Sequence, residues 1–160
     1  MLIKDLRDED FVNYKKASMF IATCFCDWKC CKEQGLDISI CQNSQISKQK
    51  NIDIPIYEIY DRYINNDITS SIVIGGLEPM LQFNDILETI KFFRNKECLD
   101  DFVIYTGYYS NEIKKNIEIL KQFSNIIIKY GRFIPNQEKH YDDVLGIYLA
   151  SNNQYAERIC

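Results

Sequence analysis

The chain has 160 residues, 46% of them hydrophobic, with 19 lysines and arginines against 23 aspartates and glutamates. This predicts a single compact domain, residues 1–160, with a core large enough to fold unaided. The basic residues are scattered and the net charge is −4, which argues against a nucleic-acid partner. The N-terminal sequence MLIKDLRDEDF lacks the apolar core of a signal peptide, and no apolar run approaches the roughly 18 residues of a membrane span. We therefore expect a cytoplasmic protein with no membrane partner.

Short apolar runs rich in β-branched and aromatic residues predict strands along the chain. They lie at residues 18–24, 71–74, 101–106, 125–129 and 145–150. Apolar residues at helical spacing predict helices at 56–65, 83–94 and 111–123, and the polar stretch 42–51 predicts a surface loop. Strands that alternate with helices are typical of βα units around a parallel sheet, where ligands bind at the carboxyl ends of the strands.

Five of the seven cysteines fall within 18 residues, directly after the first predicted strand. In a reducing compartment such cysteines are better interpreted as metal ligands than as disulfides. Thiolates suit both zinc and iron–sulfur clusters, so on composition alone a zinc site is as compatible as a cluster. The zinc site would use four of five cysteines, Cys24, Cys26, Cys30, Cys31 and Cys41.

Five sequence segments occur in an order that is typical of one family. The first is Cys26-x3-Cys30 followed by a third cysteine, Cys41, before Gln42-Asn43. The other four read GGLEP (75–79), YTGY (105–108), YGRF (130–133) and SNNQ (151–154). Together they resemble the radical S-adenosylmethionine (radical SAM) enzymes, and specifically the activating proteins of anaerobic ribonucleotide reductases. The usual spacing of the cysteines there is CxxxCxxC, so Cys41 lies in an enlarged loop.

The resemblance implies an α/β fold, an incomplete parallel βα barrel of the radical SAM type. It implies a [4Fe–4S] cluster with one open iron, held by Cys26, Cys30 and Cys41, with Cys24 and Cys31 as competing ligands. It also implies a set of residues near S-adenosylmethionine (SAM), namely Ile40, Gln42, Gly75, Gly76, Glu78, Thr106 and Asn153. For Gly76 we expect a bulky substitution to strike the bound SAM and to leave the iron content intact.

The implied activity is reductive cleavage of SAM and formation of a glycyl radical on anaerobic ribonucleotide reductase. A flavodoxin or ferredoxin would supply the electron. A chain of this length has little material to enclose a substrate, which favours a protein substrate. Another glycyl-radical enzyme, a small-molecule substrate, or a zinc-stabilised module without catalysis are the alternatives.

Overall fold

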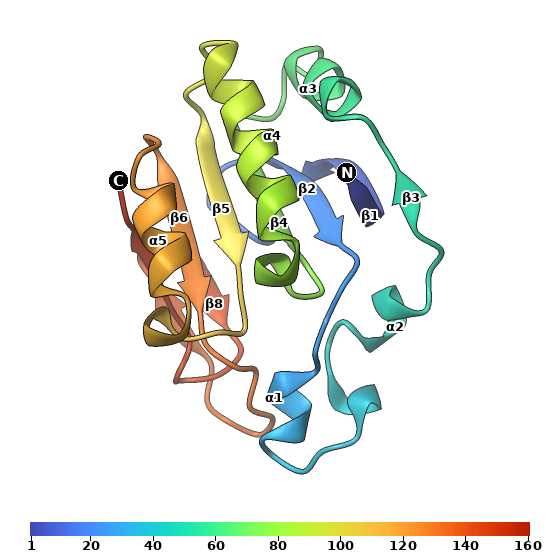
Figure 1. Cartoon of the computed structure of the whole chain (residues 1–160). Helices are drawn as coiled ribbons and strands as arrows, with labels where there is room; N and C mark the ends of the chain where they lie inside the picture. Colours follow the sequence, from blue (N-terminus) through green and yellow to red (C-terminus); the bar gives the residue numbers. More distant parts are fainter.

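The computed structural model describes all 160 residues and is built on a seven-stranded mixed sheet with the order β3-β1-β2-β4-β5-β6-β9 (Figure 1). Its central strands are parallel, and β1, β3 and β9 pair antiparallel to their neighbours. The strands of this sheet are β1 (Leu2–Asp10), β2 (Ser18–Thr23), β3 (Ile52–Asp53), β4 (Ser71–Gly76), β5 (Asp101–Tyr105), β6 (Ile126–Tyr130) and β9 (Tyr155–Arg158). A separate antiparallel hairpin is formed by β7 (His140–Asp142) and β8 (Ile147–Leu149).

The larger helices connect the parallel strands and pack against one face of the sheet (Figure 1). They are α3 (Ile56–Ile64), α4 (Phe83–Asn95) and α5 (Lys114–Leu120). The cysteine-rich region carries two single-turn helices, α1 (Lys29–Lys32) and α2 (Ser44–Ser47), and 3₁₀ turns occur at Ile38–Ile40, Pro79–Gln82 and Ser110–Glu112. None of the helices combines the length and the apolar character needed to cross a bilayer.

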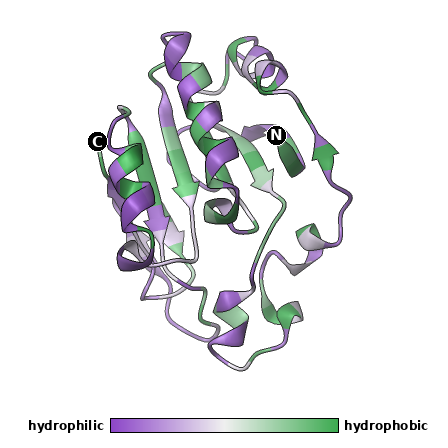
Figure 2. Ribbon diagram, in the orientation of Figure 1, coloured by the Kyte–Doolittle hydropathy of each residue, from purple (hydrophilic) through white to green (hydrophobic).

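The two faces of the sheet have different coverings, because successive strand residues point to opposite sides. On one face, strand residues such as Ile72 and Ile104 pack under the apolar sides of α3, α4 and α5. Figure 2 shows the resulting pattern, with hydrophobic strands and helices that are hydrophilic on their outer side. On the opposite face, Phe20, Val73 and Val103 pack against the segment after β1 and against the β7–β8 hairpin. None of the longer helices therefore covers this second face, which meets only the single-turn helix α2 through Ile46.

The expected parallel βα barrel is wrong. The sheet is open and mixed, and it ends at the antiparallel strands β3 and β9. Only three helical crossovers join parallel strands, and a βα barrel closes with eight such strands. The antiparallel strands β1 and β9, which lie next to the parallel strands, escaped the sequence analysis because they read LIKDLRDED and YAER. Charged residues of this kind are common on strands near a sheet edge and obscure the apolar pattern.

The elements with strong apolar patterns match their predicted positions to within a few residues. Strands β2, β4, β5 and β6 and helices α3 and α4 were all expected. The helix expected at 111–123 is shorter, because residues 110–112 form a 3₁₀ turn before α5. The run at 145–150 forms β8 of the hairpin and takes no part in the main sheet. The expected surface loop at 42–51 contains α2.

Candidate functional site

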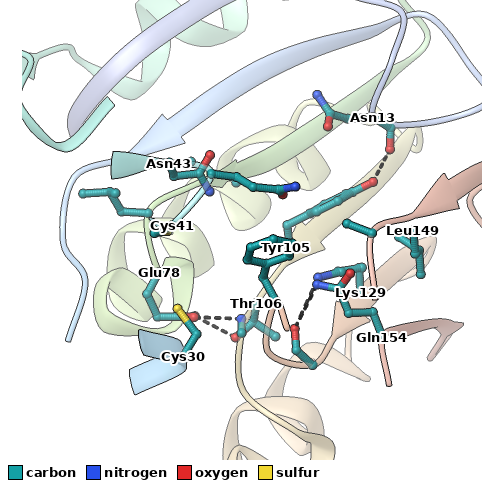
Figure 3. Close-up of a pocket in the computed structure, with 18 of the residues that line it drawn as sticks. Asn13, Cys30, Cys41, Asn43, Glu78, Tyr105, Thr106, Lys129, Leu149 and Gln154 are labelled. Atoms are coloured by element: carbon teal, nitrogen blue, oxygen red, sulfur yellow. Dashed lines mark hydrogen bonds between the residues drawn. The ribbon is translucent and has the colours of Figure 1, made fainter. Parts of the chain in front are cut away.

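A pocket of about 400 Å³ lies at the carboxyl ends of the parallel strands, on the face that α3, α4 and α5 leave uncovered (Figure 3). Strand alternation places Phe20, Gly75, Tyr105 and Lys129 on its floor, since these residues share a face with the second core. Side chains from the cysteine region and from the hairpin complete the walls. The five sequence segments that defined the family resemblance all contribute residues to this one pocket.

Three cysteines face the pocket, and they are the three expected to hold the cluster. Cys26, Cys30 and Cys41 line it, whereas Cys24 and Cys31 are buried and do not. The backbone N–H of Cys24 donates to Gln82 Oε1 at 2.6 Å. The Sγ of Cys31 lies 3.9 Å from that of its neighbour Cys30. Cys24 thus lies apart from the pocket, whereas Cys31 stays next to Cys30 without lining the pocket.

The pKa values of the three pocket thiols are shifted by their neighbours and by burial. The adjacent Cys30 side chain lowers the pKa of Cys41 and the backbone at Asn43 adds to this, whereas the proximity of Cys41 raises the pKa of Cys30. Burial raises the pKa of Cys26 to about 12, against a hydrogen bond of 3.3 Å from the backbone N–H of Trp28. Metal binding requires thiolates, so loading this site would release protons.

The donor set fits a cluster better than a single ion. No group of three or more His, Cys, Asp or Glu side chains converges closely enough to hold one metal ion. A zinc knuckle needs four ligands around one point, whereas three cysteines on a cube each bind a different iron. Three pocket-facing thiols beside a free volume therefore suit an iron–sulfur cluster.

The cysteine region is held in place by contacts with the other motif segments. The N–H of Glu78 donates to the carbonyl of Phe25 at 2.7 Å, and the hydroxyl of Tyr108 donates to Asp27 at 2.6 Å. Arg132, which is 4% exposed, pairs with Glu33 at 2.9 Å and with Glu112. The ends of β2, β4, β5 and β6 thus fix the loop that carries Cys26 and Cys30.

The carboxylate of Glu78 is a buried cross-link between two strand ends. Its Oε1 accepts a hydrogen bond from Thr106 Oγ1 at 2.6 Å and its Oε2 accepts one from the Gly107 N–H at 2.9 Å (Figure 3). The Met80 N–H donates a third bond, to Oε1, at 3.0 Å. Burial raises the pKa of Glu78, and these three bonds oppose the rise. Glu78 and Thr106 were both expected near SAM. Both line the pocket, with polar groups that are already paired to each other.

The two glycines that end β4 have different surroundings. Gly76 has φ +82°, and a Cβ there would lie 2.8 Å from the Cβ of Ala22 on β2. The expectation that a bulky residue at 76 would strike the ligand is therefore wrong, because it would first strike the strand that leads to the cysteines. A Cβ at Gly75 would meet only side-chain atoms, at 3.2 Å from the Phe20 ring.

The remaining expected residues are divided between the pocket and its surroundings. Gln42 lines the pocket. Ile40 does not and is 47% exposed. Asn153 also lies outside the lining, where its side-chain amide donates to Tyr109 Oη at 3.0 Å and to the Arg132 carbonyl at 2.9 Å. Its neighbour Gln154 lines the pocket instead.

Lys129 is the functional candidate that the sequence analysis missed. Its side chain is buried on the pocket floor, and its Nζ donates only to the Gly131 carbonyl, at 3.3 Å. Burial lowers the pKa of Lys129 to about 8, although Glu78 and Cys30 oppose the change. The position of this lysine directly after three isoleucines, residues 126–128, could have identified it as a functional candidate, because buried parallel strands rarely carry a charge.

Comparison with known families agrees with the chemistry of the thiols. The family model described as a 4Fe-4S single cluster domain matches residues 15–155. The match covers the cysteine region, the four parallel strands and the hairpin. A search of curated proteins finds no match for this chain.

Proposed function

Because the chain belongs to the family of 4Fe-4S single cluster domains, we propose that it is a radical SAM activase that generates a glycyl radical on anaerobic ribonucleotide reductase. The observation that carries the proposal is the meeting of all five motif segments in one pocket at the ends of the parallel strands. Three pocket-facing thiols supply the cluster ligands, and the space beside them would take the cofactor. The proposal does not depend on a closed barrel.

Cys26, Cys30 and Cys41 would hold the [4Fe–4S] cluster, which supplies an electron for the cleavage of SAM. With SAM bound, this electron would serve to break the bond from the sulfur of SAM to its 5′-carbon, with methionine as one product. The 5′-deoxyadenosyl group would leave as 5′-deoxyadenosine, with its added hydrogen atom supplied by the glycine Cα of the partner protein, which would become the glycyl radical. A flavodoxin or ferredoxin is the proposed donor of the electron.

The residues of this chain would bind and orient SAM and exclude water from it. Lys129 offers a buried ammonium, whose charge suits the carboxylate of the methionine part of SAM. Glu78 holds the ends of β4 and β5 in register through Thr106 and Gly107, so that the pocket floor keeps its shape. The Tyr105 hydroxyl donates to the Asn13 carbonyl and ties the segment after β1 to the same floor.

There are two kinds of alternative: one keeps the radical chemistry with a different target, and the other is a zinc module without catalysis. The pocket itself does not select ribonucleotide reductase over another glycyl-radical enzyme or a small-molecule substrate. The zinc-stabilised module is the non-catalytic alternative, although the burial of Cys24 and Cys31 away from the pocket disfavours a four-thiol site.

The test is anaerobic reconstitution followed by reaction with SAM and dithionite. Brown protein that releases 5′-deoxyadenosine, and that gives a doublet in electron paramagnetic resonance with anaerobic ribonucleotide reductase of the same organism, would support the proposal. Colourless zinc protein would contradict it. SAM cleavage with no doublet would keep the radical chemistry and move the target to one of the alternatives.

The ligand assignment has its own test in single cysteine variants. Cys26→Ala, Cys30→Ala and Cys41→Ala should each lose the [4Fe–4S] absorbance and the doublet. Cys24→Ala is the matched control, since this buried thiol does not line the pocket and its loss should leave the cluster intact. A full cluster in Cys41→Ala would show that the ligand set is wrong.

A further inference from the structure

Two adjacent cysteines, Cys30 and Cys31, lie in the single-turn helix α1, and only Cys30 lines the pocket. Their Sγ atoms are 3.9 Å apart, and Cys31 is 3% exposed. Successive residues of an α-helix point in directions about 100° apart around its axis. A rotation of α1 about its axis would therefore bring Cys31 to the pocket in place of Cys30, so the rotational position of this helix decides which thiol can bind a metal.

Helix α1 cannot fix this rotation by itself. It has four residues, and so short a helix is unstable without tertiary contacts. The residue before it, Trp28, has φ +60°, a left-handed conformation that is strained for a bulky side chain. The position of α1 must therefore be imposed by contacts with the rest of the chain.

Gln34, which follows α1, ties the backbone of Cys30 to the turn after β6. Its Nε2 donates to the Cys30 carbonyl at 2.6 Å and to the Phe133 carbonyl at 2.9 Å. One side-chain amide thus joins the pocket cysteine to a distant part of the chain. Phe133 also lines the pocket, so these two bonds link two of its walls.

Arg132, in the same turn after β6, holds Glu33 at the C-terminal end of α1. Its Nε donates to Glu33 Oε2 at 2.9 Å and its Nη2 donates to Glu33 Oε1 at 3.0 Å. This two-point contact fixes orientation as well as distance. Arg132 is 4% exposed and also donates to the Gly107 carbonyl at 2.9 Å, so its guanidinium is itself held in place. A fixed group therefore binds a residue that must turn whenever α1 turns.

We propose that Gln34 and Arg132 are positioning residues that select Cys30 over Cys31 as a ligand of the [4Fe–4S] cluster. They hold the end of α1 from two sides and so lock the rotation that turns the Cys30 thiol to the pocket and keeps Cys31 out of it. The inference rests on the proposed function, because it takes Cys30 as one of the cluster ligands.

The experiment removes both contacts from the α1 side, in the double variant Glu33→Ala/Gln34→Met, which we call the released variant. Neither of these two residues is buried, so the fold should tolerate both changes. Asp27 keeps the hydrogen bond from Tyr108 that anchors the segment before α1. Helix α1 should therefore stay next to the strand ends and lose its fixed rotation.

After anaerobic reconstitution and reduction, the released variant should give two overlapping cluster signals in electron paramagnetic resonance, because either cysteine can bind. Adding Cys31→Ala should leave one signal. The second readout is a gain of cluster. Cys30→Ala alone should lose the [4Fe–4S] absorbance, and Cys30→Ala in the released variant should regain it through Cys31. A loss of stability alone would not produce this gain.

The matched control changes the same residue types elsewhere, in the double variant Glu58→Ala/Gln45→Met. Both side chains are exposed, on α3 and α2. The control should show one signal and should not restore the cluster to Cys30→Ala. Restoration in the control as well would overturn the selection. A single signal in the released variant, together with no restoration by it, would also overturn the selection.

None of these measurements uses SAM, so a failure of the selection differs from a failure of the proposed function. Absence of SAM cleavage in the unaltered protein would contradict the proposed function and leave the selection of Cys30 standing. A full cluster in Cys30→Ala alone would contradict the proposed ligand set and overturn the selection with it.

Discussion

Replacing Gly76 should damage the structure that supports the cysteines before it damages ligand binding. Gly76 has a φ of +82°, a conformation that is strained for an L-residue with a side chain. A Cβ at this position would also lie 2.8 Å from the Cβ of Ala22. The backbone strain costs about 1–2 kcal/mol and the overpacking about 1–3 kcal/mol. We therefore expect Gly76→Ala to lower the free energy of unfolding by about 2–5 kcal/mol, which for a chain of this size is a fall in Tm of roughly 4–20 °C.

Anaerobic thermal and urea denaturation of Gly76→Ala measures this loss, with Gly75→Ala as the matched neighbour. A Cβ at Gly75 would meet only side-chain atoms of Phe20 and Tyr105, and Gly75 has no positive φ, so Gly75→Ala should change stability by less than about 1 kcal/mol. Because Ala22 lies on the strand that leads to the cysteines, iron content should fall together with stability in Gly76→Ala. Wild-type stability in that variant would refute the reasoning from backbone conformation.

Three other changes test single contacts. Glu78→Ala leaves three buried donors without an acceptor and should cost about 3 kcal/mol or more in stability, measured by urea denaturation, and Glu78→Gln should recover part of it. Lys129→Met removes a buried ammonium, so at pH 7 the free energy of unfolding should rise by about 1–3 kcal/mol while SAM affinity, measured by calorimetry, falls; unchanged affinity would exclude the lysine from the site. Burial acts to raise the pKa of Asp101, but hydrogen bonds from Arg158, Lys16 and Tyr14 outweigh it and lower this pKa to about 2. The ionised carboxylate therefore contributes about 2 kcal/mol to the free energy of unfolding above pH 4, and this contribution is lost as the pH falls toward 2. The stability difference between wild type and Asp101→Asn should shrink over that acid range, and a constant difference would contradict the assignment.

The sequence by itself determined the parallel core and the chemistry of the cysteines. Strands β2, β4, β5 and β6 are buried on both faces, so their apolar runs are continuous and easily recognised. The crowding of thiols after the first of these strands pointed to metal chemistry, because thiolates are preferred ligands of zinc and iron–sulfur clusters. These features depend on local patterns, and local patterns can be read without knowing what packs against them.

Only the tertiary structure decided the shape of the sheet, the surroundings of the thiols and the place of Lys129. The antiparallel strands β1 and β9 flank the parallel core, so their charged residues gave no strand signal. The spacing of the cysteines did not show that Cys26 and Cys41 line the pocket while Cys24 and Cys31 do not. Whether a cysteine faces the pocket depends on tertiary contacts, such as the hydrogen bond from the backbone of Cys24 to Gln82. Which side of a strand faces a pocket is likewise set by the elements that cover each face, and this long-range information is what a single sequence does not contain.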